Sequence, residues 1–234
     1  MKRSEINSIM READDFMRGH GFRLPPFAYW TPEEWAGKGD EVREIVDHNM
    51  GWDITDFGLG EYANTGLFLF TIRNGDPANL ATGRGKLYAE KALIVDVDQV
   101  TPLHFHWRKV EDIINRGGGQ LVIQLYNSTA DDGLADDEVV VSTDGVRRTV
   151  PAGGTVVLEP GESITLPTRL YHSFWGAGSK VLVGEVSLVN DDNTDNRFYE
   201  PVGRFPQIEE DEPPLHLLTT DYASWYRPGV ADSR

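Results

Sequence analysis

The middle of the chain consists of short hydrophobic runs separated by polar and glycine-rich turns. Residues 67–72, 120–126 and 181–189 are rich in β-branched and aromatic side chains, a composition typical of strands. Asn74-Gly75-Asp76-Pro77 and Gly117-Gly118-Gly119 are turn signals between such runs. Further strands are predicted at 86–97, 100–107, 138–142, 147–150, 155–158, 163–166 and 172–175. Short strands at this regular spacing predict an all-β sandwich or barrel.

The first sixty residues have a different pattern, which favours helices. Apolar residues recur at near-helical spacing between Ile6 and Met17, and Gly19 ends that pattern. Thr31, followed by a proline and two glutamates, is typical of a capped helix start. Another short helix is predicted at 41–48. These segments would form a helical extension on the N-terminal side of the barrel.

We predict a single domain over residues 1–234, because no repeat, low-complexity tract or linker divides the sequence. Residues 1–60 form a helical extension, residues 61–200 the β-barrel, and residues 201–234 a C-terminal segment that wraps over it. A chain of this length can bury a sizeable core without disulfides.

The amino-acid composition limits the kinds of site and partner that the chain can have. The chain has no cysteine, which excludes disulfides and thiolate sites and leaves histidine and carboxylate as the strong metal ligands. Its net charge of −16 makes nucleic acid an unfavourable partner. The N-terminus lacks the apolar core of a signal peptide, and the apolar run around residues 67–72 is too short to cross a membrane. We therefore expect a cytoplasmic protein that acts on a small molecule.

Three histidines and one glutamate form the most informative pattern in the sequence. His104 and His106 are two residues apart on a predicted strand, so their side chains point to the same face. Glu111 and His172 complete a three-His, one-carboxylate set that suits Mn, Fe, Co, Ni or Zn. Glu111 is an odd number of residues from His106. A bulge or turn must therefore intervene before Glu111 can face the same metal.

These residues match the spacing of the two cupin motifs. The first reads His104-x-His106-x4-Glu111-x6-Gly118, and the second reads Gly161-x5-Pro167-x4-His172. Asp98 and Arg169 stand where the motifs commonly have glycine. The resemblance implies a mainly β fold, the cupin double-stranded β-helix or jelly-roll barrel, and a metal held by the four motif residues. By analogy with cupins, we expect a homodimer.

Within the cupins, the chain resembles the D-lyxose isomerase family. The stretches that carry this resemblance are 102–119, 190–198 and 209–212. The resemblance implies reversible conversion of D-lyxose to D-xylulose, and of D-mannose to D-fructose, with Mn(II). Co(II), Fe(II), Ni(II) and Zn(II) also suit the ligand set.

Aldose–ketose isomerisation needs a metal-stabilised enediolate and a group that moves a proton between two carbons. If the break in the strand precedes residue 109, Lys109 faces the metal, and the cation should lower its pKa. Lys109 is therefore one candidate for the acid/base residue, although it could instead be an exposed lysine on a turn. Glu185, on a strand after His172, is the second candidate.

Residues near the motifs are candidates for binding the sugar hydroxyls. Acids and amides suit hydroxyl groups, and an aromatic ring can stack on the sugar, although turns and cores use the same residue types. The predicted substrate residues are Trp107, Arg169, Asp191, Asp192, Asn193 and Arg197.

Two alternative functions remain open at this stage. The same ligands hold Fe(II) in a cupin dioxygenase, and a non-catalytic sugar-binding cupin would also keep them. A sugar phosphate substrate is disfavoured by the acidic composition, although Arg108, Arg116 and Arg169 would offer cations.

Overall fold

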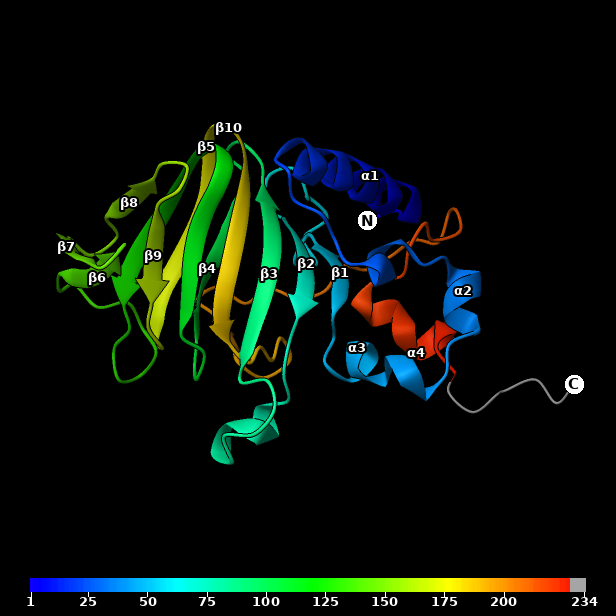
Figure 1. The fold of residues 1–234 in the computed structure, drawn as a ribbon. Helices are drawn as coiled ribbons and strands as arrows, with labels where there is room; N and C mark the ends of the chain where they lie inside the picture. The colour runs from blue at the N-terminus through cyan, green and yellow to red at the C-terminus, as the bar shows by residue number, and fades with distance from the viewer. Residues whose placement is uncertain (228–234) are drawn as a thin grey trace, which may run out of the picture.

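The computed structural model describes residues 1–227, and within them eleven strands form one antiparallel sheet that curls into a barrel (Figure 1). The strands are β1 (Gly51–Thr55), β2 (Leu67–Arg73), β3 (Tyr88–Val95), β4 (Thr101–His106), β5 (Glu111–Asn127), β6 (Val139–Thr143), β7 (Val146–Val150), β8 (Thr155–Leu158), β9 (Ser163–Leu166), β10 (Leu170–Leu188) and β11 (Asn196–Phe198). The predicted mainly β, cupin-type barrel is confirmed.

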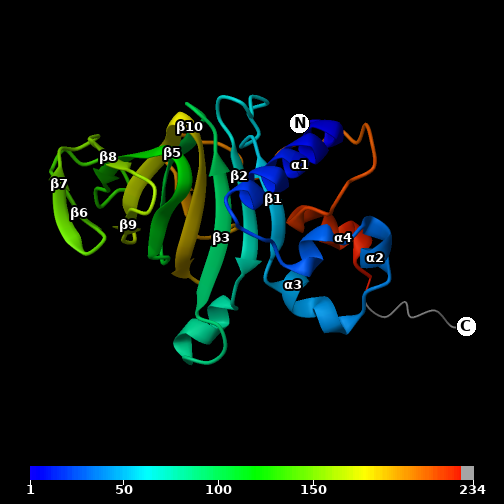
Figure 2. The same cartoon turned by 45° about the horizontal axis from the view of Figure 1, so that its top comes forward.

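The helices are short, apart from the first. They are α1 (Arg3–Gly19), α2 (Pro32–Ala36), α3 (Arg43–Asp47) and α4 (Tyr222–Trp225), with 3-10 turns at Pro26–Tyr29, Asp40–Val42, Pro77–Ala81 and Thr219–Asp221. Figure 2 shows that α1, α2, α3 and α4 gather on the β1 side of the sheet. The predicted cap at Thr31 is present, because its hydroxyl accepts the N–H of Glu34 and the Glu34 carboxylate accepts the N–H of Thr31. No helix in this part of the chain is long and apolar enough to cross a bilayer.

Two long strands join the layers of the barrel. β10 pairs with β5 along most of its length, and it also pairs with β4 near His172 and with β3 over residues 181–188. Alternate residues of β5, including Ile113 and Leu121, point into the barrel core. Because β10 borders both β3 and β4, residues far apart in the sequence meet inside the barrel.

Three glycines that we predicted to form a turn lie inside β5. A Cβ atom at Gly118 would stand 2.1 Å from the carbonyl oxygen of Lys180, and Gly118 has φ +98°. The pairing of β5 with β10 shifts register at this point, between Ala177 and Val181. The glycines therefore allow a bulge with close backbone contact, so that both strands continue where the sequence indicated separate elements.

The strand β1 lies within the stretch for which we predicted helices. It pairs with β2, whose hydrophobic run is buried on both faces. Leu67 and Leu69 point into the barrel core, while Phe68 and Phe70 pack in a second core with residues of α1. The double burial explains why β2 lacks the polar alternation of an exposed strand.

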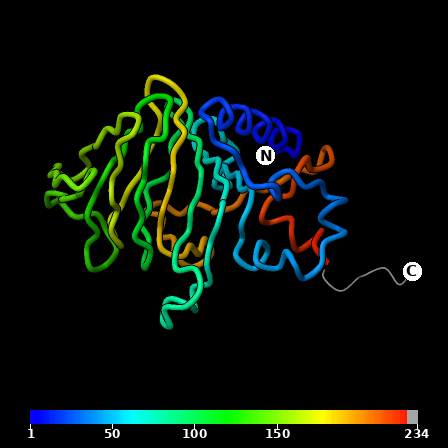
Figure 3. Tube along the Cα trace, in the orientation of Figure 1, coloured from blue at the N-terminus to red at the C-terminus, as the bar shows by residue number. Residues whose placement is uncertain are grey.

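The start of the chain lies beside residues 209–221 of the C-terminal segment, as the trace in Figure 3 shows. Lys2 pairs with Glu209 as an isolated bridge. The Arg3 guanidinium contacts the carboxylates of Glu210 at 2.7 Å and Asp221 at 2.9 Å. These contacts fix the C-terminal segment against α1. Residues 228–234, which we assigned to the same segment, lie outside the described residues.

Candidate metal and sugar site

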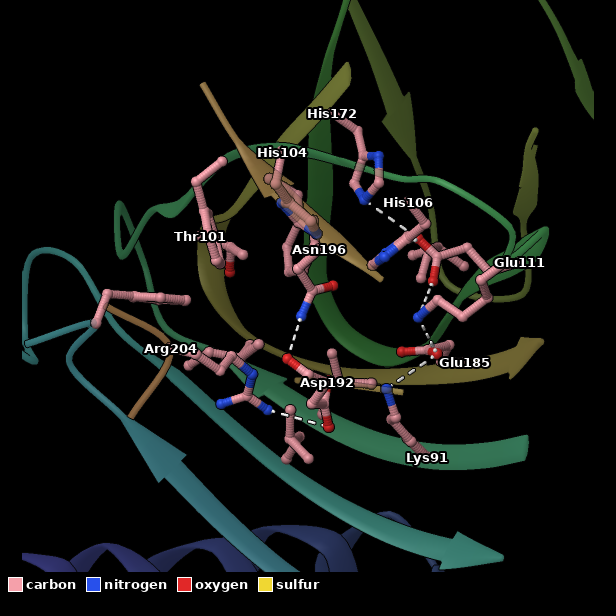
Figure 4. A pocket seen from close by; sticks show the side chains of 18 residues that line it. Lys91, Thr101, His104, His106, Glu111, His172, Glu185, Asp192, Asn196 and Arg204 are labelled. Carbon is pink, nitrogen blue, oxygen red and sulfur yellow. Dashed lines mark hydrogen bonds and ion pairs between the residues drawn. The ribbon is translucent and has the colours of Figure 1, made fainter. Parts of the chain in front are cut away.

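Three buried histidines face one another inside the barrel (Figure 4). His104 and His106 come from β4, and His172 comes from β10 directly opposite His104 in the register. One ring nitrogen from each lies within 4.8 Å of the others. Phe105, between the two β4 histidines, points the other way and packs on Tyr171. The strand alternation expected from the sequence is thus present.

Backbone carbonyls orient two of the rings. The Nδ1 of His104 donates to the carbonyl of Pro102 at 2.7 Å, and the Nδ1 of His172 donates to that of Leu170 at 3.0 Å. A carbonyl only accepts, so Nδ1 carries the proton in both rings and Nε2 keeps its lone pair. Within residues 1–227, the buried Nδ1 of His106 and Nε2 of His172 have no hydrogen-bond partner. The lone pairs on Nε2 of His104 and His172, held in place by these carbonyl contacts, fit a metal ion.

Glu111 joins the histidines across a break in the strands. β4 ends at His106 and β5 begins at Glu111, so the predicted interruption spans residues 107–110. The Oε1 of Glu111 lies 3.1 Å from His172 Nε2 and 3.4 Å from His106 Nε2. The structure therefore brings together all four residues that we predicted to bind a metal.

The electrostatics of this cluster favour the protonation states of metal ligands. Burial, with the neighbouring His172 and His106, holds the pKa of His104 well below its usual value. Burial and Lys109 also lower the pKa of His106. Burial opposes the charge on Glu111, but Lys109 and His106 hold its pKa well below the usual value. Neutral imidazoles and an ionised carboxylate are the forms that coordinate a divalent cation.

Next to the cluster, two lysines and two glutamates form a buried network. Lys109 Nζ lies 2.7 Å from Glu111 and 2.9 Å from Glu185. Lys91 Nζ contacts the same Glu185 oxygen at 3.2 Å, and both lysines donate to the side-chain oxygen of Asn190. The predicted acid/base pair, Lys109 and Glu185, is thus in direct contact beside the histidines.

Two carboxylates act on the pKa of Lys109. Burial opposes its charge, but Glu111 and Glu185 together raise the pKa of Lys109 above its usual value. The predicted fall in the pKa of Lys109 rested on a bound cation alone and left out these two carboxylates, which lie within hydrogen-bonding distance. Burial likewise opposes the charge on Glu185, and Lys109 and Lys91 lower its pKa. The structure therefore favours an ammonium facing an ionised carboxylate.

These groups line one cavity, together with an apolar wall and a second charged group formed by Asp192 and Arg204 (Figure 4). Arg204 Nη2 lies 3.3 Å from Asp192 and is also paired with Asp53. Burial opposes the charge on Asp192, but Arg204 lowers its pKa. The other lining residues are Phe57, Leu67, Leu69, Leu93, Thr101, Ile113, Phe174, Asn196 and Phe198.

Trp107 and Arg169, two predicted substrate residues, do not line this cavity. Trp107 is 38% exposed and packs against the outward-facing Phe105. The Arg169 side chain stacks over both rings and binds Asp132 at 2.8 Å. The backbone N–H of Arg169 donates to the carbonyl of His106. The residue thus supports the outside of the ligand-bearing strand.

Three further predicted residues also lie outside the lining. Asp191 organises its own loop by accepting the N–H groups of Asn193 and Thr194, and Asn193 is exposed. Arg197 lies on β11 between two residues that face the cavity, so its side chain points the other way. Of the six predicted substrate residues, Asp192 alone lines the described cavity.

Several lining residues escaped the sequence analysis. Lys91 is a charge within the apolar run of β3, and that signal alone could have marked it as buried and paired. Asn196 lies within the 190–198 stretch, at the start of β11, but nothing local distinguishes it from its neighbours. Arg204 comes from the C-terminal segment, and only the folded chain places it in the cavity.

Comparison with known proteins identifies the family. The profile of the D-lyxose isomerase family matches residues 1–222. The chain belongs to the D-lyxose isomerase family. A D-lyxose/D-mannose isomerase from Serratia proteamaculans is 49% identical over 95% of this chain and 98% of its own length. One from Escherichia coli O157:H7 is 47% identical with the same coverage. The predicted family and the predicted sugar-isomerase class are confirmed.

Solved structures support the fold of this D-lyxose isomerase family member. The L-ribose isomerase of Acinetobacter sp. DL28, solved with L-ribose, superposes with a TM-score of 0.60 at 15% identity. The match covers 89% of this chain and 98% of the other. At this identity the likeness establishes a shared barrel architecture.

Proposed function

We propose that the protein interconverts D-lyxose and D-xylulose, and D-mannose and D-fructose, as a metal-dependent aldose–ketose isomerase. One observation carries the proposal: the three-histidine, one-glutamate cluster shares a cavity with the buried Lys109–Glu185 pair. The names of relatives nearly half identical to the chain support the choice of sugars.

His104, His106, Glu111 and His172 would hold the metal. Three nitrogen donors and one carboxylate fit a divalent ion of the first transition row, and we propose Mn(II), with Co(II), Fe(II), Ni(II) or Zn(II) as substitutes. When bound, the ion supplies Lewis-acid polarisation of the sugar carbonyl.

Lys109 and Glu185 would carry out the proton transfers. Glu185, ionised between two lysines, is the base that accepts the proton from one carbon and returns it to its neighbour. The Lys109 ammonium, 2.9 Å away, donates to the carbonyl oxygen that becomes a hydroxyl. The resulting amine takes the proton of the neighbouring hydroxyl, which becomes the new carbonyl, so that Lys109 ends the reaction as an ammonium. Burial of both groups keeps water from competing for the proton.

The assembly and location rest on the sequence alone. We propose a homodimer and a cytoplasmic location, and size-exclusion chromatography with light scattering tests the first.

The test is a ketose-formation assay on chelator-stripped protein with D-lyxose and D-mannose, with and without Mn(II). We expect D-xylulose and D-fructose to form when the metal is restored. No ketose from either sugar, despite one tightly bound ion per chain, would overturn the proposal. Oxygen uptake would then indicate a dioxygenase, and sugar binding without turnover a binding protein.

A further inference from the structure

Two buried lysines share the same two acceptors beside the histidine cluster. Lys109 Nζ donates to Oε1 of Glu185 at 2.9 Å and to Oδ1 of Asn190 at 3.2 Å. Lys91 Nζ donates to the same Asn190 oxygen at 2.7 Å and lies 3.2 Å from Oε1 of Glu185, its register partner on β10 (Figure 4). An ammonium only donates, so the Asn190 atom that faces both lysines must be its oxygen. Asn190 is 9% exposed and does not line the cavity.

Among residues 1–227, Asn190 is the only uncharged side chain that accepts a hydrogen bond from Lys109. The ammonium has three N–H groups, and Nζ contacts three side chains: Glu111 at 2.7 Å, Glu185 at 2.9 Å and Asn190 at 3.2 Å. The contact to Asn190 is the longest of the three. Because hydrogen bonds between charged groups are the stronger ones, this neutral contact is the one that a substrate oxygen can replace.

The two lysines hold one oxygen of Glu185 and leave the other. Within the described part of the chain, Oε1 accepts from Lys109 and contacts Lys91, whereas Oε2 accepts no hydrogen bond. Glu185 is one of the residues that line the cavity. Oε2 is therefore the oxygen that can take a proton from a bound molecule, and an N–H group that turned toward it would occupy it.

Asn190 is itself fixed by Asn74, the residue that follows β2. The Asn74 side chain donates to the carbonyl of Asn190 at 2.9 Å and accepts its N–H at 3.0 Å. It also donates to the carbonyl of His48 and accepts the N–H of Gly75. These four bonds use all the hydrogen-bonding groups of the Asn74 amide, which is 3% exposed. The position of Asn190 thus depends on a buried residue outside the cavity lining.

We propose that Asn190 is a positioning residue of the isomerase. It holds one N–H of Lys109 away from Oε2 of Glu185 until a sugar oxygen takes the place of the amide oxygen, so that Oε2 stays free to act as the base. Without Asn190, two neighbouring ammonium groups would lose a shared acceptor, and the freed N–H groups would turn to Oε2. This inference rests on the proposed function and adds the residue that keeps its acid from blocking its base.

The first test is Asn190→Ala, loaded with Mn(II) and assayed with D-lyxose and D-mannose. We expect kcat to fall at least about tenfold, because two hydrogen bonds from charged groups are lost and the base is occupied. KM should change by less than about threefold, since Asn190 does not line the cavity. Asn64→Ala, at an exposed asparagine outside the lining, is the matched control. Metal content and thermal unfolding establish that each variant folds.

Two further variants separate positioning from a general loss of structure. Asn190→Asp keeps an oxygen acceptor at the same place, so its kcat should be higher than that of Asn190→Ala. Asn74→Ala should lower kcat in the otherwise unaltered protein. In the Asn190→Ala background it should cause no further loss, because Asn74 acts on the lysines through Asn190.

The outcomes separate the two proposals. If the unaltered protein isomerises neither D-lyxose nor D-mannose, the proposed function fails. If it isomerises them, but folded Asn190→Ala loses less than about tenfold in kcat or loses mainly in KM, the positioning role alone is overturned. A kcat in Asn190→Asp no higher than in Asn190→Ala also overturns it, as does a further loss from Asn74→Ala in the Asn190→Ala background. If Asn190→Ala does not fold, Asn190→Leu, which has the same branched shape and no acceptor, decides by the same criteria.

Discussion

The Asp195 carboxylate binds the backbone of Lys109. Its Oδ2 accepts the Lys109 N–H at 3.0 Å, and its Oδ1 accepts the N–H of Arg108 at 2.9 Å. Asp195 is 3% exposed and lies on the loop after β10. It therefore fixes the break between β4 and β5, on either side of which His106 and Glu111 stand.

From this contact we predict that Asp195→Ala weakens both metal binding and turnover. Two buried N–H groups would lose a charged acceptor, and the break would no longer hold Glu111 and Lys109 in place. We expect at least about a tenfold loss in Mn(II) affinity by calorimetry on chelator-stripped protein. Asp195→Asn, which keeps one oxygen acceptor, should lose less. Equal Mn(II) affinity in the unaltered protein and Asp195→Ala would refute this role.

Replacement of the proposed base should act on kcat. In Glu185→Gln, the amide is nearly isosteric but cannot take a proton, so we expect kcat to fall by about a hundredfold or more with little change in Mn(II) affinity. Steady-state kinetics with D-lyxose and metal analysis measure both. Glu138→Gln, at an exposed acid, is the control. A variant that keeps more than about a tenth of the unaltered kcat would remove Glu185 from the proton transfer.

Loss of one histidine should empty the metal site. His104→Ala removes an oriented Nε2 donor, and we expect the protein to purify with far less than one metal ion per chain. Elemental analysis measures this directly. His20→Gln is the matched control, because His20 is exposed and lies outside the cluster. Full metal occupancy in His104→Ala would contradict the assigned ligand set.

The ion pairs that join Arg3 to the C-terminal segment should contribute to stability. The Arg3 side chain is 2% exposed and contacts Glu210 and Asp221. In Arg3→Met, these charge-assisted hydrogen bonds are lost, and we expect the free energy of unfolding in urea to fall by about 2–3 kcal/mol. Lys2→Met, at an exposed neighbouring cation, is the control and should differ little from the unaltered protein. Equal urea midpoints for both variants would show that these ion pairs do not stabilise the folded state.

His216 should make stability depend on pH. Its ring stacks on Trp52 with the planes 8° apart, and burial lowers its pKa below the usual value of 6.5. The unfolded chain therefore binds the proton more readily. The contribution of His216 is complete above about pH 6.5 and is lost as the pH falls toward the folded pKa. Urea unfolding between pH 7.5 and 5.5 should give a shallower decline in His216→Gln than in the unaltered protein. Parallel declines would exclude the effect.

The sequence predicted the cluster of three histidines and one glutamate because its signal is local. His104, His106 and Glu111 lie within eight residues, and strand alternation with one break determines where their side chains point. Lys109 lies in the same stretch, which explains why its position was predicted. Its direct contact with Glu185 was not predicted, because the two residues are seventy-six positions apart in the sequence.

The remaining features depend on contacts that no local pattern encodes. The glycines at 117–119 have the composition of a turn, and the close passage of Lys180 makes them part of a strand. Nothing in the sequence distinguishes Arg204 from the other arginines. Its place in the cavity wall depends on its contacts with Asp53 and Asp192, which are distant in the sequence. Trp107 and Arg169 lie near the ligands in sequence, but they face the outside of the strand.

The late position of β11 and Arg204 in the chain has a consequence for biosynthesis. All four residues of the metal cluster lie before residue 173, whereas Asn196, Phe198 and Arg204 complete the cavity wall much later. On the ribosome, the emerging barrel can gather its metal donors while one side of the pocket is still open to solvent. Under the proposed function, a nascent chain would acquire its ion before it encloses a sugar, and fusions or truncations at the C-terminal end should impair substrate capture before they impair metal loading.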